Sequence, residues 1–276
     1  MSLSIRTNVA SIDAQNNLSQ TQDALTLTMD QLSSGDRITS AAVDAAGLGI
    51  STNLEAQISS YAQAGRNAND GVSLAQTAAG SLTQVANILT SLRNLAMEAA
   101  SDGVGTAGRS DITTEAGQLQ AELDRINASA EYNGNNFFAN AGAQTFQVGI
   151  RGTANDVITV DTTGMDVSST GLGVNGLLFD SNTDAQASIT AIDTALTNVQ
   201  GFQATLGAAS NRLESAVNTI QAESQNLSAA DSRIRDVDVA SATSELSRQQ
   251  VLSQAGIAVL AQANNTPQEA LKLLNG

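Results

Sequence analysis

Cysteine, histidine and tryptophan are all absent from this 276-residue chain. Without the first two, no disulfide, thiolate nucleophile, imidazole base or standard zinc site can form. Aromatic residues are also scarce, at 3% of the chain, which argues against a large core packed on aromatic rings. From these absences we expect a chain that holds no metal or cofactor and is not an enzyme.

Positive charge is scarce as well. The chain has 12 Lys and Arg against 27 Asp and Glu, and its net charge is −15. An acidic surface repels nucleic acids and anionic lipid surfaces, so we expect neither as a partner. No apolar run approaches the roughly 18 residues of a membrane-spanning helix. The first residues also lack the basic start and apolar stretch of a secretory signal, so no cleaved signal peptide is expected.

What the chain does have is two long stretches with apolar residues at alternating steps of three and four. The first stretch lies between Leu54 and Leu89, and the second between Ile189 and Leu227. A 3.5-residue repeat keeps one seam of a helix against a partner helix. The pattern therefore predicts a mainly α fold: a long antiparallel coiled-coil or helical-bundle rod.

Capping signals suggest where the helices begin and end. Thr52 with Glu55, and Thr183 with Gln186, have the form of capping boxes, so we expect the two long helices to begin there. The first should end near residues 101–108, where glycines cluster. A shorter helix should follow and stop at the Asn-Gly turn signal of residues 133–134.

The middle of the chain has a different pattern. Phe146, Val148 and Ile150 alternate with polar residues, and so do Ile158 and Val160 beyond a turn at residues 152–156. Alternation of this kind around a turn predicts a small β-hairpin. Residues 162–182 are rich in Gly, Ser, Thr and Asp, and we expect them to be irregular.

Both ends of the chain are amphipathic and carry apolar residues at a seven-residue spacing, namely Leu18, Leu25 and Leu32 at one end and Val239, Leu246 and Leu260 at the other. Fixing a residue costs about 1–2 kcal/mol of backbone entropy, and a buried Leu or Ile returns only about 1.5–3 kcal/mol. One such helix alone cannot offset its own ordering. Pairing of the N- and C-terminal helices helps but still leaves apolar stripes open to water. We therefore expect both ends to stay mobile in a single copy and to become helical when neighbouring copies bury them.

The single proline leaves two interpretations of the C-terminus. Thr266 and Pro267 together resemble the start of a short final helix that follows a kink. The alternative is one continuous helix that bends at Pro267.

Five long motifs give the chain its signature: SIRTNVASIDAQNNL from residue 4, LSSGDRITSAAVDAAGLGI from Leu32, GRNANDGVSLAQTAAGSL from Gly65, RIRDVDVASATSEL from Arg233, and QAGIAVLAQANNTPQEALKLL from Gln254. They closely resemble segments of bacterial flagellin, in the same order. The resemblance implies that paired terminal helices form the inner tube of the flagellar filament and that long helices with a hairpin form an outer tube. Residues 1–44 and 236–276 would belong to the inner tube, and residues 45–182 and 183–235 to the outer tube. With a short variable middle, this looks like a minimal flagellin that lacks large outer domains.

The resemblance also implies a function and partners. The chain would polymerise with itself into the extracellular filament that drives swimming, and the seven-residue seam positions would pack between subunits. It would leave the cell through the flagellar export apparatus without a cleaved signal, and it would meet the filament cap, hook-junction proteins and a secretion chaperone. Two alternatives stay open: a hook–filament junction protein, and a secreted coiled-coil ligand or adhesin.

A further implied partner is the flagellin-sensing Toll-like receptor. Leu89, Leu95 and Glu115 agree with the receptor-contact pattern of related sequences, but Ser91 stands where receptor-binding relatives carry Arg. Loss of a charged contact from a hot spot costs about 2 kcal/mol or more, so we expect weakened detection. Both leucines also suit simple packing within the rod.

Two other patterns carry little chemistry. Asp236 and Asp238 lack the Gly and the downstream Glu of a calcium loop, and they fit a charge pair near a helix start. Asn127 and Asn226 match the N-glycosylation pattern, but both fall on expected helices. In this family O-glycosylation is the more common modification, and residues 162–183 would be its place.

Overall fold

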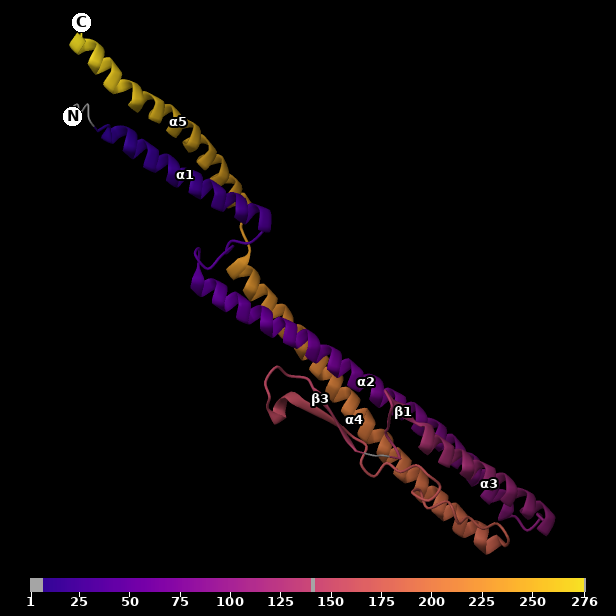
Figure 1. The fold of residues 1–276 in the computed structure, drawn as a ribbon. Coiled ribbons are helices and arrows are strands. Elements are labelled where there is room, and N and C mark those ends of the chain that lie inside the picture. The colour runs from indigo at the N-terminus through magenta and orange to yellow at the C-terminus, as the bar shows by residue number, and fades with distance from the viewer. Residues whose placement is uncertain (1–6, 140–141, 276) are drawn as a thin grey trace. The chain divides into compact units, whose positions relative to one another are not determined.

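The computed structural model describes residues 7–139 and 142–275 of the chain. Five helices dominate this part (Figure 1): α1 (Val9–Ser34), α2 (Ala45–Ala99), α3 (Thr106–Ser129), α4 (Asn182–Arg235) and α5 (Val239–Asn275). Two antiparallel pairs of short strands lie between α3 and α4, namely β1 (Glu131–Tyr132) with β2 (Asn135–Asn136) and β3 (Ala143–Gln147) with β4 (Val157–Asp161). The predicted class, long antiparallel helices with a small β-hairpin region, is confirmed. Within the described residues, no helix is both long and apolar enough to cross a lipid bilayer.

The chain divides into two compact units. Unit 1 consists of residues 1–56 and 226–276, and unit 2 consists of residues 57–225. The long helices α2 and α4 each contribute to both units, because the division falls inside them.

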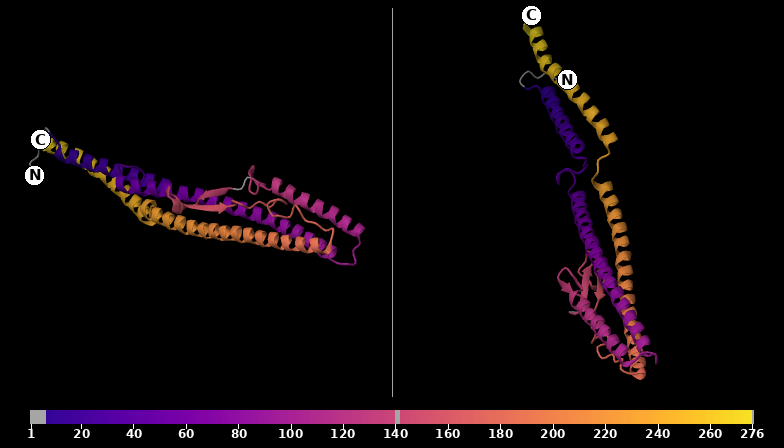
Figure 2. Two further views of the ribbon diagram at one scale, coloured as in Figure 1. Left: turned by 90° about the horizontal axis from the view of Figure 1, so that it is seen from below. Right: turned by 90° about the vertical axis from the view of Figure 1, so that its right-hand side faces the viewer.

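Unit 1 contains an antiparallel pair, α1 and α5, which lie side by side (Figure 1 and Figure 2). Asn8 Nδ2 donates to the carbonyl of Ala263 at 2.8 Å, and Ser11 Oγ donates to Asn264 Oδ1 at 2.7 Å. Further along, Leu18 packs onto Gly256, where its Cδ1 would lie 3.2 Å from an added Cβ. The missing side chain of Gly256 therefore lets the two helices approach closely.

Local signals explain the ends of α1. Asn8 Oδ1 accepts a hydrogen bond from the amide of Ser11 at 3.2 Å and caps the N-terminus of the helix. Gly35, at φ 80°, ends it in the left-handed conformation that glycine adopts without strain.

Helix α5 runs as one helix from Val239 to Asn275, so the expectation of a separate final helix after Pro267 is wrong. Proline has no N–H to donate to the carbonyl four residues earlier, which here is that of Ala263. That carbonyl accepts the Asn8 side-chain amide instead. A partner from the other end of the chain thus replaces the hydrogen bond that the proline removes.

In unit 2, α2 and α4 pack antiparallel with a constant register. Gly65 lies opposite Ile220 and Gly71 opposite Leu213, while Arg93 Nε reaches Asp193 Oδ1 at 2.7 Å. Their apolar seams form one core with α3 and the β region, and its largest fully buried side chains are Leu82, Val85, Leu89, Leu92, Leu123, Phe138, Val160, Val167, Phe179, Ile192, Leu206 and Leu213. The two long apolar repeats therefore meet as the sequence predicts.

The segment between β4 and α4 has irregular backbone, as expected, but it is a packed part of unit 2. Val167, Val174 and Phe179 are almost fully buried. Helix α3 holds the segment in place: Asp124 Oδ1 accepts the amide of Ser169 at 2.7 Å, and Gln120 Nε2 donates to the carbonyl of Val174 at 2.7 Å. The segment thus packs on the core of unit 2 and covers part of it.

The expected starts of the two long helices are wrong by a few residues. Helix α2 begins at Ala45 because Asp44 Oδ1 accepts the amide of Gly47 at 2.8 Å. Thr52 lies inside the helix, where its hydroxyl donates back to the carbonyl of Leu48. Helix α4 begins at Asn182, ahead of Thr183, because Ser181 Oγ accepts the amide of Asp184 at 3.1 Å.

Two turns in the middle also differ from the expectation. Asn133 and Gly134, at φ 51° and 76°, connect β1 to β2 as a tight hairpin turn, whereas α3 has already ended at Ser129. Strand β3 ends at Gln147, so Val148 and Ile150 lie outside it. The amides of Val148 and Gly149 both donate to the carbonyl of Asp156, which closes the turn earlier than the alternation implies.

A pair of leucine substitutions tests the core of unit 2. Leu213 of α4 is fully buried against Gly71 of α2, whereas Leu178 is 54% exposed. We expect Leu213→Ala to lower the free energy of unfolding by about 2–5 kcal/mol, because it leaves a cavity. Leu178→Ala should change it by about 0.5 kcal/mol at most. Urea unfolding followed by circular dichroism measures both, and equal effects would contradict this packing.

Candidate functional site

Large apolar side chains lie exposed on α1 and α5. On α1 these are Val9, Ile12, Leu27 and Met29, and on α5 they are Val239, Val251, Leu252, Ile257 and Val259. Among the described residues, all exposed large apolar side chains except Met97 and Leu178 belong to unit 1. Exposed apolar surface on this scale is typical of a surface that another protein covers.

Few of the described side chains are fully buried between these two helices. The buried residues of α1 are Ala14 and Thr28, both small, and on the described part of α5 the buried apolar residue is Ala242. Burial of such small side chains removes little apolar area from water. The pair thus has a thin seam and leaves apolar surface uncovered on its outer faces.

The structure places the seven-residue seam positions at intermediate depth. Leu18, Leu25, Leu32, Leu246 and Leu260 are half-buried, whereas Val239 is 58% exposed. Leu18 contacts the position of Gly256 on the opposite helix, so this part of the seam lies inside the molecule.

Sequence reasoning missed the second apolar stripe, although a signal for it was present. Val251 with Leu252, and Ile257 with Val259, are apolar neighbours one or two residues apart. Such neighbours point to different sides of a helix, so they cannot all face one partner. These pairs indicate that α5 has contacts on more than one side.

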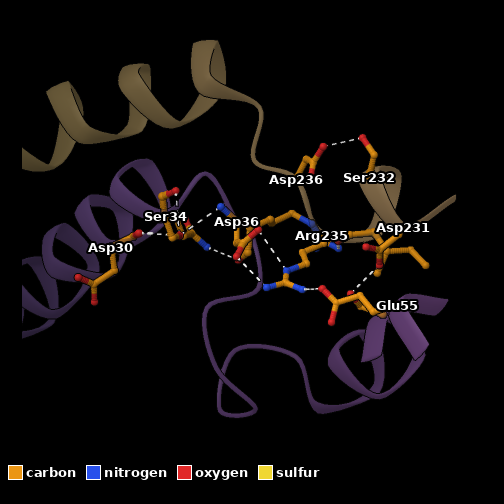
Figure 3. Close-up of polar contacts among 12 residues, drawn as sticks. Asp30, Ser34, Asp36, Glu55, Asp231, Ser232, Arg235 and Asp236 are labelled. Carbon is orange, nitrogen blue, oxygen red and sulfur yellow. Dashed lines mark hydrogen bonds and ion pairs between the residues drawn. The ribbon is translucent and has the colours of Figure 1, made fainter. Parts of the chain in front are cut away.

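A second feature of unit 1 is an ionic cluster around Arg235, the last residue of α4 (Figure 3). Its guanidinium contacts Asp36 through Nε at 3.2 Å and also binds Glu55 of α2. The hydrogen bond to Asp36 and the charges of Asp36, Glu55 and Asp231 raise the pKa of Arg235 above its usual value. The cation therefore stays charged, and it has no acid–base role.

Backbone hydrogen bonds surround this cluster and join the two connectors of unit 1. The amide of Arg37 donates to the carbonyl of Arg235 at 2.5 Å, and the amide of Val237 donates to the carbonyl of Gly35 at 2.9 Å. The segment that links α1 to α2 is thereby fixed to the segment that links α4 to α5. The Arg235 cluster acts as a clamp on both connectors.

The Asp236–Asp238 pair has structural partners. Asp236 Oδ2 accepts the hydroxyl of Ser232 at 2.6 Å, and Asp238 Oδ1 accepts the amide of Ala240 at 3.0 Å, at the start of α5. Among the described residues, no three acidic side chains are placed to hold a metal ion. These carboxylates stabilise helix ends instead.

The four positions that the sequence predicts as receptor contacts differ in accessibility. Leu89 is fully buried in the core of unit 2, and Leu95 is half-buried against it. Ser91 is exposed on α2, where its hydroxyl donates to the carbonyl of Asn87, and Glu115 is exposed on α3. Only Ser91 and Glu115 of the four therefore present a largely free side chain.

Replacement of Arg235 tests the clamp. We expect Arg235→Gln to increase amide exchange of Arg37 and Val237 about five- to tenfold, because Asp36, Glu55 and Asp231 then lose their shared cation. Hydrogen exchange with mass spectrometry measures this effect in the isolated subunit. The matched control is Arg248→Gln, which removes an exposed ion pair to Glu245 within α5. Unchanged exchange in Arg235→Gln would show that the backbone hydrogen bonds alone hold the connectors.

Comparison with known proteins identifies the family. Residues 5–143 match the bacterial flagellin N-terminal helical region, and residues 189–274 match the bacterial flagellin C-terminal helical region. The chain is 39% identical to a flagellin of Halalkalibacterium halodurans, with 94% of this chain and 93% of that protein aligned. It is 36% identical to a flagellin of Bacillus subtilis, with 98% of this chain and 99% of that protein aligned.

A solved structure also shares the fold. A putative flagellar hook-associated protein from Vibrio parahaemolyticus matches with a TM-score of 0.61 over 70% of this chain and all of that chain, at 17% identity. That identity supports a common fold alone, whereas the flagellin matches run along nearly the whole sequence. The chain therefore belongs to the bacterial flagellin family, and it is a structural subunit of the extracellular flagellar filament and not an enzyme.

Proposed function

We propose that copies of this flagellin pack together through the exposed apolar faces of α1 and α5, which form the inner tube of the filament. The observation that supports this most strongly is the concentration of exposed Val, Leu, Ile and Met side chains on these two helices. Burial of one such side chain contributes about 1.5–3 kcal/mol, so stacked copies stabilise helices that a single copy leaves half uncovered.

In this proposal residues 1–44 and 236–276 form the inner tube, and residues 45–182 and 183–235 form the outer tube. The division of the chain into two compact units supports a two-part organisation. The well-packed core of unit 2 suits a part that folds before assembly, whereas the thin seam between α1 and α5 suits a part that assembly completes.

The half-buried seam leucines have a different role from the outer faces. Leu18, Leu25, Leu32, Leu246 and Leu260 align α1 with α5, and Val239 lies exposed at the start of α5. All six would contribute to packing between subunits, the first five by fixing the shape of the pair.

Aspartate substitutions separate these two roles. Ile257→Asp should abolish filaments and leave the isolated subunit unchanged, because Ile257 is 55% exposed in a single copy. Leu25→Asp and Leu246→Asp should abolish filaments and also weaken the α1–α5 pair, with unit 2 still folded. Purified subunits are dialysed into high salt and inspected for tubes by negative-stain microscopy, with circular dichroism as the folding check.

The matched control for Ile257→Asp is Gln254→Asp, a change at an exposed polar position of the same helix. It should still form filaments. Normal filaments from Ile257→Asp would rule out the proposed packing face.

The two alternatives considered from the sequence are separated by abundance and by self-association. A filament subunit is present in far more copies per cell than a junction protein. A secreted coiled-coil ligand or adhesin would have no use for uncovered apolar faces on both terminal helices. Long tubes formed by the pure protein would exclude both alternatives.

We also propose that the subunit leaves the cell through the flagellar export apparatus without a cleaved signal peptide. It would then add to the filament beneath the cap, beyond the hook-junction proteins, and a secretion chaperone would shield its apolar helices before export. The exposed apolar side chains of α5 support a need for such shielding.

The mass of the subunit tests the export route. The subunit dissociated from filaments should have the same mass as the subunit found inside an export-blocked cell, apart from any glycan. Intact-mass spectrometry before and after removal of glycans makes the comparison. A filament subunit that is shorter at its N-terminus would contradict export without cleavage.

Innate detection through the Toll-like receptor is proposed to be weak because Ser91 offers no charge. The exposed positions of Ser91 and Glu115 support access by a partner, while the buried Leu89 positions the helix from within. Ser91→Arg should increase the potency of the protein in a receptor reporter cell line. A Ser91→Ala variant is the control, and an Arg variant no more potent than the unmodified protein would oppose the proposal.

A further inference from the structure

An open groove lies along the second half of α1. It has a volume of about 590 Å³ and is lined by α1 and by Thr39 and Ser40 of the following connector. Asp23 and Asp30 stand one heptad apart along this groove, with the partly exposed Leu27 between them. The groove therefore combines two negative charges with one apolar side chain and a rim of Ser and Thr hydroxyls.

The carboxylates of the groove have no cation within the chain's described part. Asp23 and Asp30 take part in none of its ion pairs, and both are exposed. In Figure 3 the carboxylate of Asp30 points away from the Arg235 cluster, and only its backbone carbonyl is bonded, to the hydroxyl of Ser34. The groove is thus an acidic surface separate from the clamp.

One arginine of unit 1 is the complement of this groove. The basic side chains that the structure describes in unit 1 are Arg37, Arg233, Arg235 and Arg248. Arg235 and Arg248 bind carboxylates, and Arg37 donates to the carbonyl of Ile234. Arg233 is exposed, and among the described residues it has no carboxylate partner.

The fold keeps Arg233 from the groove of its own copy. It precedes Arg235 by two residues on α4, so the two side chains point about 200° apart around the helix. Arg235 faces the connector that lines the groove, and Arg233 therefore faces away from it. The groove and Arg233 nevertheless lie at the same level of unit 1, because the backbone of Arg37 is bonded to that of Arg235.

We propose that the acidic groove of one copy receives Arg233 of a neighbouring copy, an ionic contact that sets how subunits are placed side by side in the filament. This inference rests on the proposed packing of α1 and α5 between copies. A groove and an arginine on different sides of one subunit make a head-to-tail contact, which extends into a helical filament when the rotation between copies does not close a ring. Burial of the apolar faces stabilises the packing of copies, and this ionic contact fixes the orientation of one copy relative to the next.

Charge reversal tests the contact. Asp30→Arg and Arg233→Glu should each raise the monomer concentration needed for growth from sheared filament seeds about tenfold, because each places like charges together. A chain with both changes should grow within about threefold of the unmodified chain, since every copy then carries a reversed but matching pair. In about 1 M salt, where the screening length falls to about 3 Å, the differences should shrink. Sedimentation of polymer measures growth, and circular dichroism checks each subunit.

The matched control is Asp13→Arg, which reverses an exposed charge on α1 outside the groove. It should affect growth less than Asp30→Arg does. Equal losses for both, or no recovery in the double variant, would overturn the proposal. Normal growth of the single variants with lost secretion in cells would assign the groove to export and also overturn it. In these cases the unmodified chain still forms filaments, so the proposed function stands independently.

Discussion

The two units differ in how much of their apolar surface a single copy buries, and the rest of the structure depends on this difference. Unit 2 buries Leu, Ile, Val and Phe from three helices and an irregular segment in one core. Among the described side chains of the α1–α5 pair, the fully buried ones are small, and large apolar side chains lie exposed. In the proposed filament, packing between copies removes that surface from water. The helices that bury the least apolar surface in one copy would thus be stabilised most by contact with a second copy.

Charge repulsion between copies opposes this assembly, and in our proposal a single ion pair between copies also fixes their arrangement. A net charge of −15 on each copy makes close packing unfavourable unless charges are screened or paired. Scarce cations then matter individually: Arg93 crosslinks α2 and α4 through Asp193, and Arg235 holds the two connectors. Within the described part of unit 1, Arg233 is exposed and has no carboxylate partner, which makes it a candidate for contact with another copy.

The sequence predicts the helical architecture well because the apolar repeats are long. Alternating steps of three and four identify α2 and α4, and the antiparallel contacts of Gly65 with Ile220 and Gly71 with Leu213 confirm their pairing. Helix starts were less predictable, because several Ser, Thr and Asp residues compete as caps. Only the fold decides that Asp44 and Ser181 cap the helices. The exposure of Ile257 was missed, although Val259 two residues later already indicated that apolar side chains point to more than one side of α5.

The proline in α5 has a consequence for how the two ends of the chain recognise each other. It frees the carbonyl of Ala263, and the amide of Asn8 occupies that acceptor at 2.8 Å. An unmet carbonyl costs about 1–3 kcal/mol once water is excluded, so loss of Asn8 would leave an unpaired acceptor on α5. Residues near the two ends of the sequence thereby stabilise one another, and removal of Asn8 would weaken the pairing of α1 with α5.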